Sequence, residues 1–243
     1  MTDVGNVRKL NEDELFIDEK YQRLFLVADG MGGHNAGDVA SKMAVNIIRN
    51  YYLENIHQDM PLDSIKEAFL DAIKIANETI IRASKKFDHL RNMGTTLNLV
   101  YIHKQEIVFI NVGDSRAYIL NGNVLKQITI DHSLVEELLR TGRISASEAH
   151  NHPQKNIITS CLGTKDDYKV DVYRIKKMEN IKILLCTDGL TNAIEHIELE
   201  EILINSNVNE ATEKLVSQAK AYGGFDNITL ILIELEEPRD TNE

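Results

Sequence analysis

Short apolar runs that meet an aspartate are the feature that most constrains this chain. The runs LFLVA, FINVG and LLCT lead directly into Asp29, Asp114 and Asp188, and Asp226 stands just before the last apolar run, NITLILI. A single aspartate beside glycine or asparagine is typical of a turn. Four of them at the ends of core strands can converge at one edge of a fold, where carboxylates repel one another and are costly to bury without compensation.

A divalent cation would relieve this repulsion. Mg²⁺ and Mn²⁺ prefer oxygen ligands, and no His/Cys spacing in the chain indicates a zinc site. Two such ions about 3.5–4 Å apart can bridge one hydroxide and hold a phosphoryl group for in-line attack. Phosphate oxygens also need a cation, and Arg8, close to Glu12 and Asp13, carries the planar fork that fits them. An ordinary surface arginine is the alternative for Arg8.

Composition narrows the classes of protein that this chain can belong to. Its 243 residues suit one large domain or two small ones, and its net charge of −11 argues against a nucleic-acid partner. Cys161 and Cys186 form no disulfide framework or zinc motif. No apolar segment reaches membrane-spanning length, so we expect a cytoplasmic protein without a membrane partner.

The order of the expected elements indicates an α+β fold. Apolar runs, helical periodicity and turn residues predict a strand, two helices, a set of strands, a polar insertion, two strands, a helical region and a last strand. Their expected ranges are 21–28, 36–51, 61–80, 94–129, 131–160, 169–175, 181–187, 190–221 and 227–235. Residues 94–129 are predicted to form an antiparallel meander with a hairpin turn at Asn121-Gly122. Such an order favours antiparallel sheet covered by helices.

Seven sequence blocks carry a resemblance to a known family. In order they are TDVGNVRKLNED, VADGMGGHNAGDVAS, MGTTLNLV, NVGDSRAY, DHSLV, LCTDGL and GGFDNITLILI. From residue 2 to residue 233 this set closely resembles the bacterial metal-dependent protein phosphatases of the PP2C (PPM) family. The resemblance implies a central β-sandwich of two antiparallel sheets flanked by helices on both faces. It also implies hydrolysis of phosphoserine and phosphothreonine in proteins, with Mn²⁺ or Mg²⁺ as cofactor.

The resemblance further implies the metal ligands. Asp29 matches the family's bridging aspartate, and Gly30 matches the glycine whose backbone carbonyl binds one ion. Asp188 and Asp226 match the other two carboxylate ligands of the two core ions. Asp114 matches the aspartate that, together with Asp188, holds a weaker third ion in bacterial members.

The remaining site residues are also assigned by resemblance. Asp13, with Glu12, matches the acidic pair that orders metal-bound water, and Arg8 matches the phosphate-binding arginine. Family members use a histidine as general acid for the leaving alkoxide, and His34 is the one histidine inside a metal motif of this chain. A histidine that merely caps the glycine-rich loop is the alternative for His34, and His132 is interpreted as structural.

The family pattern also sets the expected organisation and role. A single phosphatase domain is expected over residues 1–236, with a flap at about 133–162 and a charged tail at 237–243. Within that flap many bacterial relatives carry a basic residue where this chain has Ser160, which leaves the peptide preference open. We expect a monomer that acts on phosphorylated proteins and opposes a bacterial Ser/Thr kinase.

Three other functions are compatible with parts of the sequence. A phosphatase dedicated to one phosphorylated anti-sigma-antagonist protein would keep the fold, but the intact RKLNED and GDSR blocks favour the general type. A catalytically dead phosphoprotein-binding module is disfavoured because every expected carboxylate is present. A two-metal nuclease is disfavoured by the acidic charge.

Overall fold

Eleven strands and seven α-helices are described in the computed structural model, over residues 1–32, 36–150 and 152–236. The strands are Thr2–Asp3 (β1), Asp13–Ile17 (β2), Leu24–Met31 (β3), Gly94–Thr95 (β4), Leu97–Ile102 (β5), Glu106–Val112 (β6), Arg116–Asn121 (β7), Val124–Gln127 (β8), Asp171–Lys176 (β9), Ile181–Cys186 (β10) and Ile228–Leu235 (β11). The helices are Gly37–Asn55 (α1), Leu62–Lys86 (α2), Leu134–Arg140 (α3), Ala146–His150 (α4), Asp188–Thr191 (α5), His196–Ile204 (α6) and Val208–Ala221 (α7), with a 3₁₀ turn at Asp88–Leu90 (η1).

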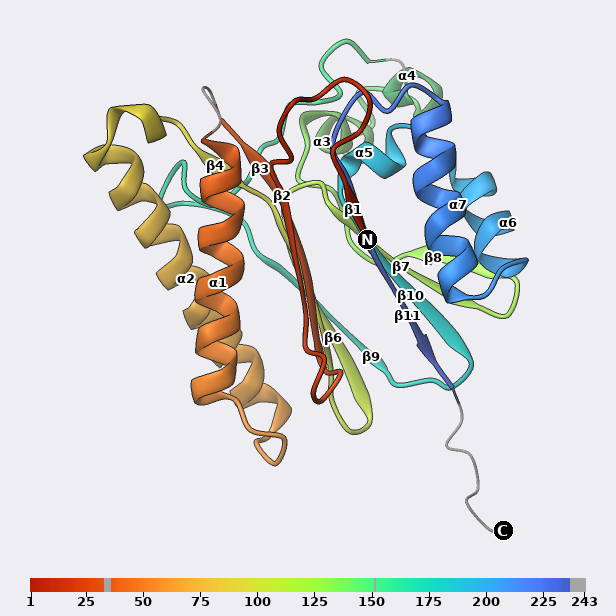
Figure 1. Ribbon diagram of the computed structural model, residues 1–243, viewed down its shortest axis with the longest axis horizontal. Helices are drawn as coiled ribbons and strands as arrows, with labels where there is room; N and C mark the ends of the chain where they lie inside the picture. The colour runs from red at the N-terminus through yellow and green to blue at the C-terminus, as the bar shows by residue number, and fades with distance from the viewer. Residues whose placement is uncertain (33–35, 151, 237–243) are drawn as a thin grey trace.

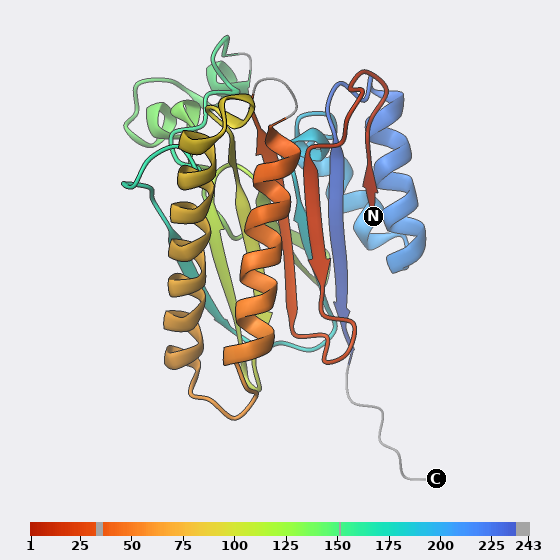
Figure 2. The same cartoon turned by 60° about the vertical axis from the view of Figure 1, so that its left-hand side comes forward.

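The strands form two antiparallel sheets that face each other (Figure 1). The first has the order β2-β3-β5-β6-β9, with β4 paired to β3, and the second has the order β1-β11-β10-β7-β8. Helices α1 and α2 lie side by side over the outer face of the first sheet (Figure 2). Helices α6 and α7 cover the outer face of the second. The predicted α+β sandwich with helices on both faces is confirmed.

Strand β3 shows why the central strands are apolar on both faces. Leu24, Leu26 and Ala28 belong to the core under α1 and α2, whereas Phe25 and Val27 belong to the core between the sheets. Successive strand residues point to opposite faces, so a strand covered on both sides needs a continuous apolar run. This explains why the run LFLVA shows no alternation of apolar and polar residues.

The layer between the sheets changes character along the strands. At one end it is filled by apolar side chains such as Phe25 and Ile183. At the other end the same strand faces carry Asp29 and Thr229, and Thr229 is fully buried. The sandwich therefore has a polar end, and the predicted site residues lie there.

One part of the predicted meander over residues 94–129 is wrong. Strands β5 and β6 pair in the first sheet and β7 and β8 in the second, so the chain changes sheets between β6 and β7. Gly113 makes this crossing with φ +110°, and a Cβ atom there would collide with the side chain of Thr96. The hairpin turn at Asn121-Gly122 is confirmed, with Gly122 in the left-handed region at φ +59°.

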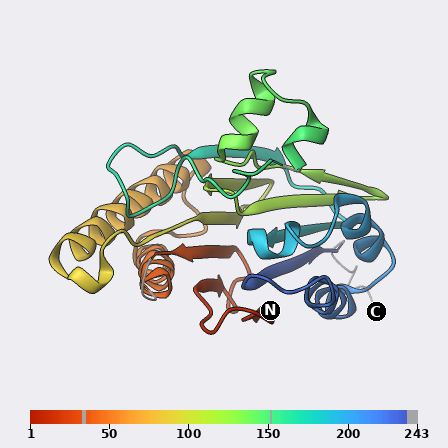
Figure 3. The same ribbon diagram turned by 90° about the horizontal axis from the view of Figure 1, so that it is seen from above.

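The polar insertion carries α3 and α4 and projects away from the two sheets (Figure 3). Its base is closed by an antiparallel bridge between Ser133 and Ile158. Ser133 also caps α3, because its hydroxyl accepts a hydrogen bond from the Glu136 backbone N–H. We call residues 133–158 the helical insertion. Over the described ranges, no helix combines the length and the apolar character that crossing a bilayer requires.

Candidate active site

Five aspartates gather at the polar end of the sandwich, and both sheets contribute. Asp13 and Asp29 are directly opposite each other on β2 and β3. Asp114 follows β6, Asp188 follows β10, and Asp226 precedes β11. The charges of all four other carboxylates act on Asp29. The structure thus brings together the aspartates that the sequence singled out.

Burial gives these carboxyl groups an unusual affinity for protons. It raises the pKa of Asp13 to about 7 and that of Asp114 to about 8, and the nearby charge of Asp188 acts in the same direction on both. Burial also raises the pKa of Asp29 well above its ordinary value, with Asp13 the largest charge contribution. Converging acids behave in this way when no cation compensates them.

The carboxylate cluster fits a divalent cation in its chemistry. Asp114 Oδ1 is buried and has no hydrogen-bond partner, a costly state that a cation would relieve. Among the residues that the structure describes, no three His, Cys, Asp or Glu side chains already converge as ligands on one point.

Hydrogen bonds from hydroxyl and amide groups hold the aspartates in position. Thr187 Oγ1 donates to Asp13 Oδ2 over 2.9 Å, and Asn192 Nδ2 donates to Asp188 Oδ2 over 2.9 Å. The Asp29 backbone N–H donates to the Thr96 hydroxyl over 2.9 Å. Sequence reasoning missed these supporting groups. Thr187 could have been found by its position, since it is the polar residue between the apolar run and Asp188.

Arg8 contacts the cluster from the solvent side. Its Nη2 donates to Asp226 Oδ2 over 2.9 Å, and its Nη1 lies 4.0 Å from Glu12 Oε2. The side chain is 47% exposed, and exposed ion pairs contribute little to stability. Arg8 can therefore exchange Asp226 for another anion at small cost.

Asn227, near the other end of the chain, helps to hold the loop that carries Arg8. Asn227 Nδ2 donates to the backbone carbonyls of Val4 and Leu10, each over 3.0 Å. Its Oδ1 accepts from the Glu12 backbone N–H over 2.8 Å. Asn227 is buried, and it uses both ends of its amide to position this loop beside Asp226.

Glu12 and Gly30 lie where β2, β3 and α1 meet. Glu12 Oε1 accepts from the Gly37 backbone N–H over 3.2 Å, and the Glu12 carbonyl accepts from the Ser41 hydroxyl over 2.6 Å. A Cβ atom on Gly30 would collide with the backbone carbonyls of Glu12 and Gly37. Only glycine fits this close approach.

Of the two histidines considered above, His34 lies outside the described residues. His132 is buried, and its Nδ1 accepts from the Gly113 backbone N–H over 3.1 Å. The ring proton therefore sits on Nε2, 3.1 Å from Asp171 Oδ2. Burial lowers the pKa of His132, so the neutral ring ties the loop before Asp114 to β9, in keeping with a structural role.

A cleft of about 240 Å³ separates the cluster from the helical insertion. Asp114 and Asp188 line one side, and Lys155 of the insertion also lines it. Sequence reasoning missed Lys155 and considered Ser160 instead. Ser160 is buried, and its hydroxyl accepts from the Lys169 backbone N–H over 2.7 Å. Its side chain is thus engaged within the fold.

Comparison with known proteins finds that the chain is similar to protein phosphatases. The family model for protein phosphatase 2C matches residues 6–223. The chain is 42% identical over 236 residues to serine/threonine phosphatase stp of Listeria monocytogenes, covering 96% of this chain and 93% of that protein. The crystal structure of the Mycobacterium tuberculosis serine/threonine phosphatase PstP/Ppp is similar at a TM-score of 0.89 and 31% identity, covering 97% of each chain. The catalytic domain of PstP in complex with two manganese ions is similar at a TM-score of 0.85 and 30% identity, covering 98% of this chain and 96% of that one.

Proposed function

The chain belongs to the protein phosphatase 2C family and is a serine/threonine protein phosphatase, and we propose that it hydrolyses its substrates at the five-aspartate cluster with bound Mn²⁺ or Mg²⁺. The observation that carries this proposal is the set of buried carboxylates that raise one another's pKa without a compensating cation. Bound at such a site, two divalent ions supply an activated water and neutralise charge on the phosphoryl group.

The proposed ligands follow from position in the cluster. Asp29, Asp188 and Asp226 would hold two core ions, with the backbone carbonyl of Gly30. Asp114, whose buried Oδ1 has no partner, would share a third ion with Asp188. A catalytically dead binding module is disfavoured, because it would have no use for buried carboxylates that repel one another.

The remaining residues would orient the attacking water, protonate the leaving group and bind the phosphate. Asp13, whose Oδ2 accepts from Thr187, would orient the attacking water together with Glu12. Arg8 would bind the phosphate oxygens through its fork after releasing Asp226. His34 is proposed to protonate the leaving alkoxide.

The same proposal covers organisation and partners. Residues 1–236 would form one domain, because the cluster takes its carboxylates from both sheets and neither sheet can form the site alone. Residues 133–162 would act as a flap over the cleft, from which Lys155 can reach a substrate. The enzyme would work as a cytoplasmic monomer on phosphorylated proteins and oppose a Ser/Thr protein kinase.

Metal dependence provides the direct test. The purified protein should release phosphate from phosphothreonine peptides in the presence of Mn²⁺ or Mg²⁺, and EDTA should abolish this release. Restoring the metal in excess over EDTA should restore the activity. Full activity in a metal-free preparation, checked by elemental analysis, would exclude the proposed role of the cluster.

Arg8→Ala should separate phosphate binding from metal binding. Loss of a charge-assisted hydrogen bond costs on the order of 1.5–3 kcal/mol, so kcat/KM should fall roughly ten- to a hundredfold, chiefly through KM. Metal affinity should rise modestly, because the guanidinium beside Asp226 repels an incoming dication. Steady-state kinetics and calorimetric metal titration measure both quantities.

Lys9→Ala is the matched control for Arg8→Ala. It removes the same charge from the adjacent exposed position and should leave kcat/KM unchanged. Unchanged KM together with weaker metal binding in Arg8→Ala would instead assign Arg8 to the structure of the metal site.

A further inference from the structure

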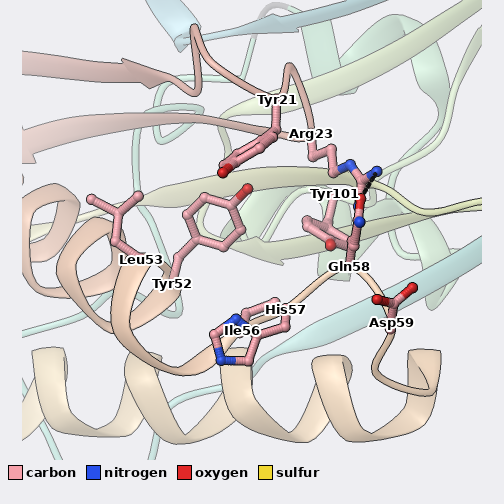
Figure 4. A pocket seen from close by; sticks show the side chains of 9 residues that line it. All are labelled: Tyr21, Arg23, Tyr52, Leu53, Ile56, His57, Gln58, Asp59 and Tyr101. Carbon is pink, nitrogen blue, oxygen red and sulfur yellow. Dashed lines mark hydrogen bonds between the residues drawn. The ribbon is translucent and has the colours of Figure 1, made fainter.

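A second cavity, of about 460 Å³, opens at the end of the sandwich opposite the aspartates. It is formed by the turn between β2 and β3, the end of α1, the loop between α1 and α2, and β5 (Figure 4). Arg23 lies beside it immediately before β3, and Asp29 lies six positions along at the other end of that strand. A cavity of this volume suits a small ligand.

The inner wall of this cavity is aromatic and rigid. Tyr52 and Tyr101 are only 5% and 1% exposed, and their ring centroids lie 6.2 Å apart in an edge-to-face arrangement. Phe69 packs against both rings. The Tyr52 hydroxyl donates to the buried Asp18 over 2.7 Å. Tyr21, which is 54% exposed, forms part of the rim, so a flat ligand would meet ring surface on two sides.

Arg23 places a cation in this cavity that has only neutral partners. Its Nη2 donates to Gln58 Oε1 over 2.9 Å, and its side chain also hydrogen-bonds Tyr101. Among the described residues, no carboxylate lies within ion-pair distance of the Arg23 guanidinium, and the nearby Asp59 pairs with Lys104 instead.

The guanidinium and the rings together select a type of ligand. Arginine offers a fork of N–H donors that matches a carboxylate or a phosphate-type group. Tyrosine rings favour stacking or edge contacts with another ring. We propose that this cavity binds a small aromatic acid, with its acidic group on Arg23 and its ring between Tyr52 and Tyr21.

Binding of two simple aromatic acids to the metal-free protein in EDTA tests this proposal. Benzoate and phenylphosphonate, titrated against ¹⁵N-labelled protein, should shift the backbone amides of residues 18–23 and 52–59 in a saturable way. The tighter of the two probes identifies the acidic group as carboxylate or phosphate. Arg23→Ala should weaken binding at least about tenfold. The affinity of Arg23→Lys should lie between those of the wild type and Arg23→Ala, since lysine keeps the charge but lacks the fork of N–H donors.

Control variants and control ligands separate the contribution of the acidic group to binding from that of the aromatic ring. Arg91→Ala removes a cation that is more exposed than Arg23 and lies beyond the far end of α2, and this variant should bind both probes as the wild type does. Tyr21→Ala, at the exposed rim, should weaken binding without unfolding the protein. The proposal is overturned if neither probe binds, if benzyl alcohol binds as tightly as benzoate, if inorganic phosphate matches phenylphosphonate, or if Arg23→Ala binds normally.

Discussion

Asp29→Asn is expected to abolish hydrolysis of phosphothreonine peptides and, in the presence of EDTA, to stabilise the protein at neutral pH. Both effects come from one carboxylate. Asp29 lies among four other carboxylates, and its pKa is raised well above the ordinary value, first by burial and then by their charges. Asparagine keeps the shape of the side chain, but it removes a charge that the proposed metal site requires and the repulsion that this charge causes. Phosphate release and urea unfolding in EDTA measure the two effects.

A charge-matched control makes this result specific. Asp71→Asn removes the same charge from the exposed face of α2 and should change neither activity nor unfolding midpoint. If Asp29→Asn remained active, Asp29 would not be a required ligand. If the variant were less stable in EDTA than the wild type, the Asp29 charge would stabilise the fold, contrary to the repulsion described here.

Acidifying the metal-free protein from about pH 8 to about pH 6 should stabilise it by on the order of a few kcal/mol. Burial raises the pKa of Asp13 to about 7 and that of Asp114 to about 8, whereas both titrate near 4 in the unfolded chain. Between pH 6 and pH 8 the folded state therefore binds more protons than the unfolded state. The stabilisation that the two aspartates contribute is complete below pH 4 and is lost as the pH rises through 7 and 8. Urea unfolding across this pH range measures it.

Two comparisons identify the groups responsible for that pH dependence. Asp114→Asn should flatten the curve near pH 8, and saturating Mn²⁺ should flatten it throughout, because a bound dication keeps the carboxylates ionised. His132 works in the opposite direction, since burial lowers its pKa and protonation below pH 6.5 destabilises the folded state. A stability that rises from pH 6 to pH 8 in EDTA would contradict the assignment.

The sequence revealed the strands that are buried on both faces but not how they divide between sheets. Runs such as LFLVA are apolar throughout, and their strands were predicted from that property alone. The change of sheet between β6 and β7 depends on Gly113 and on its close approach to Thr96, a packing relation that no sequence pattern marks. Strand β2 was missed because its run, DELFI, is short and mixes acidic with apolar residues.

The sequence predicts the carboxylates of the candidate site, but it does not predict the residues that hold these carboxylates in position. Aspartates at strand ends stand out because nothing in core packing requires them. Thr187 and Asn227 do not stand out, since threonine and asparagine are common near strand ends and their partners lie more than 170 positions away. The family pattern draws attention to Ser160, whereas Lys155 is the basic residue that the insertion contributes to the cleft.

The pairing of β1 with β11 and the grip of Asn227 on Val4 and Leu10 set an order of events during biosynthesis. A chain emerging from the ribosome presents Arg8 and Asp29 early, but their partner Asp226 and the clamp at Asn227 come only with the last strand. Every nascent chain is therefore without a complete site until almost all of it has been translated. Chains that end before residue 226 lack Asp226, Asn227 and β11, and therefore cannot hold the first strand in place in this way.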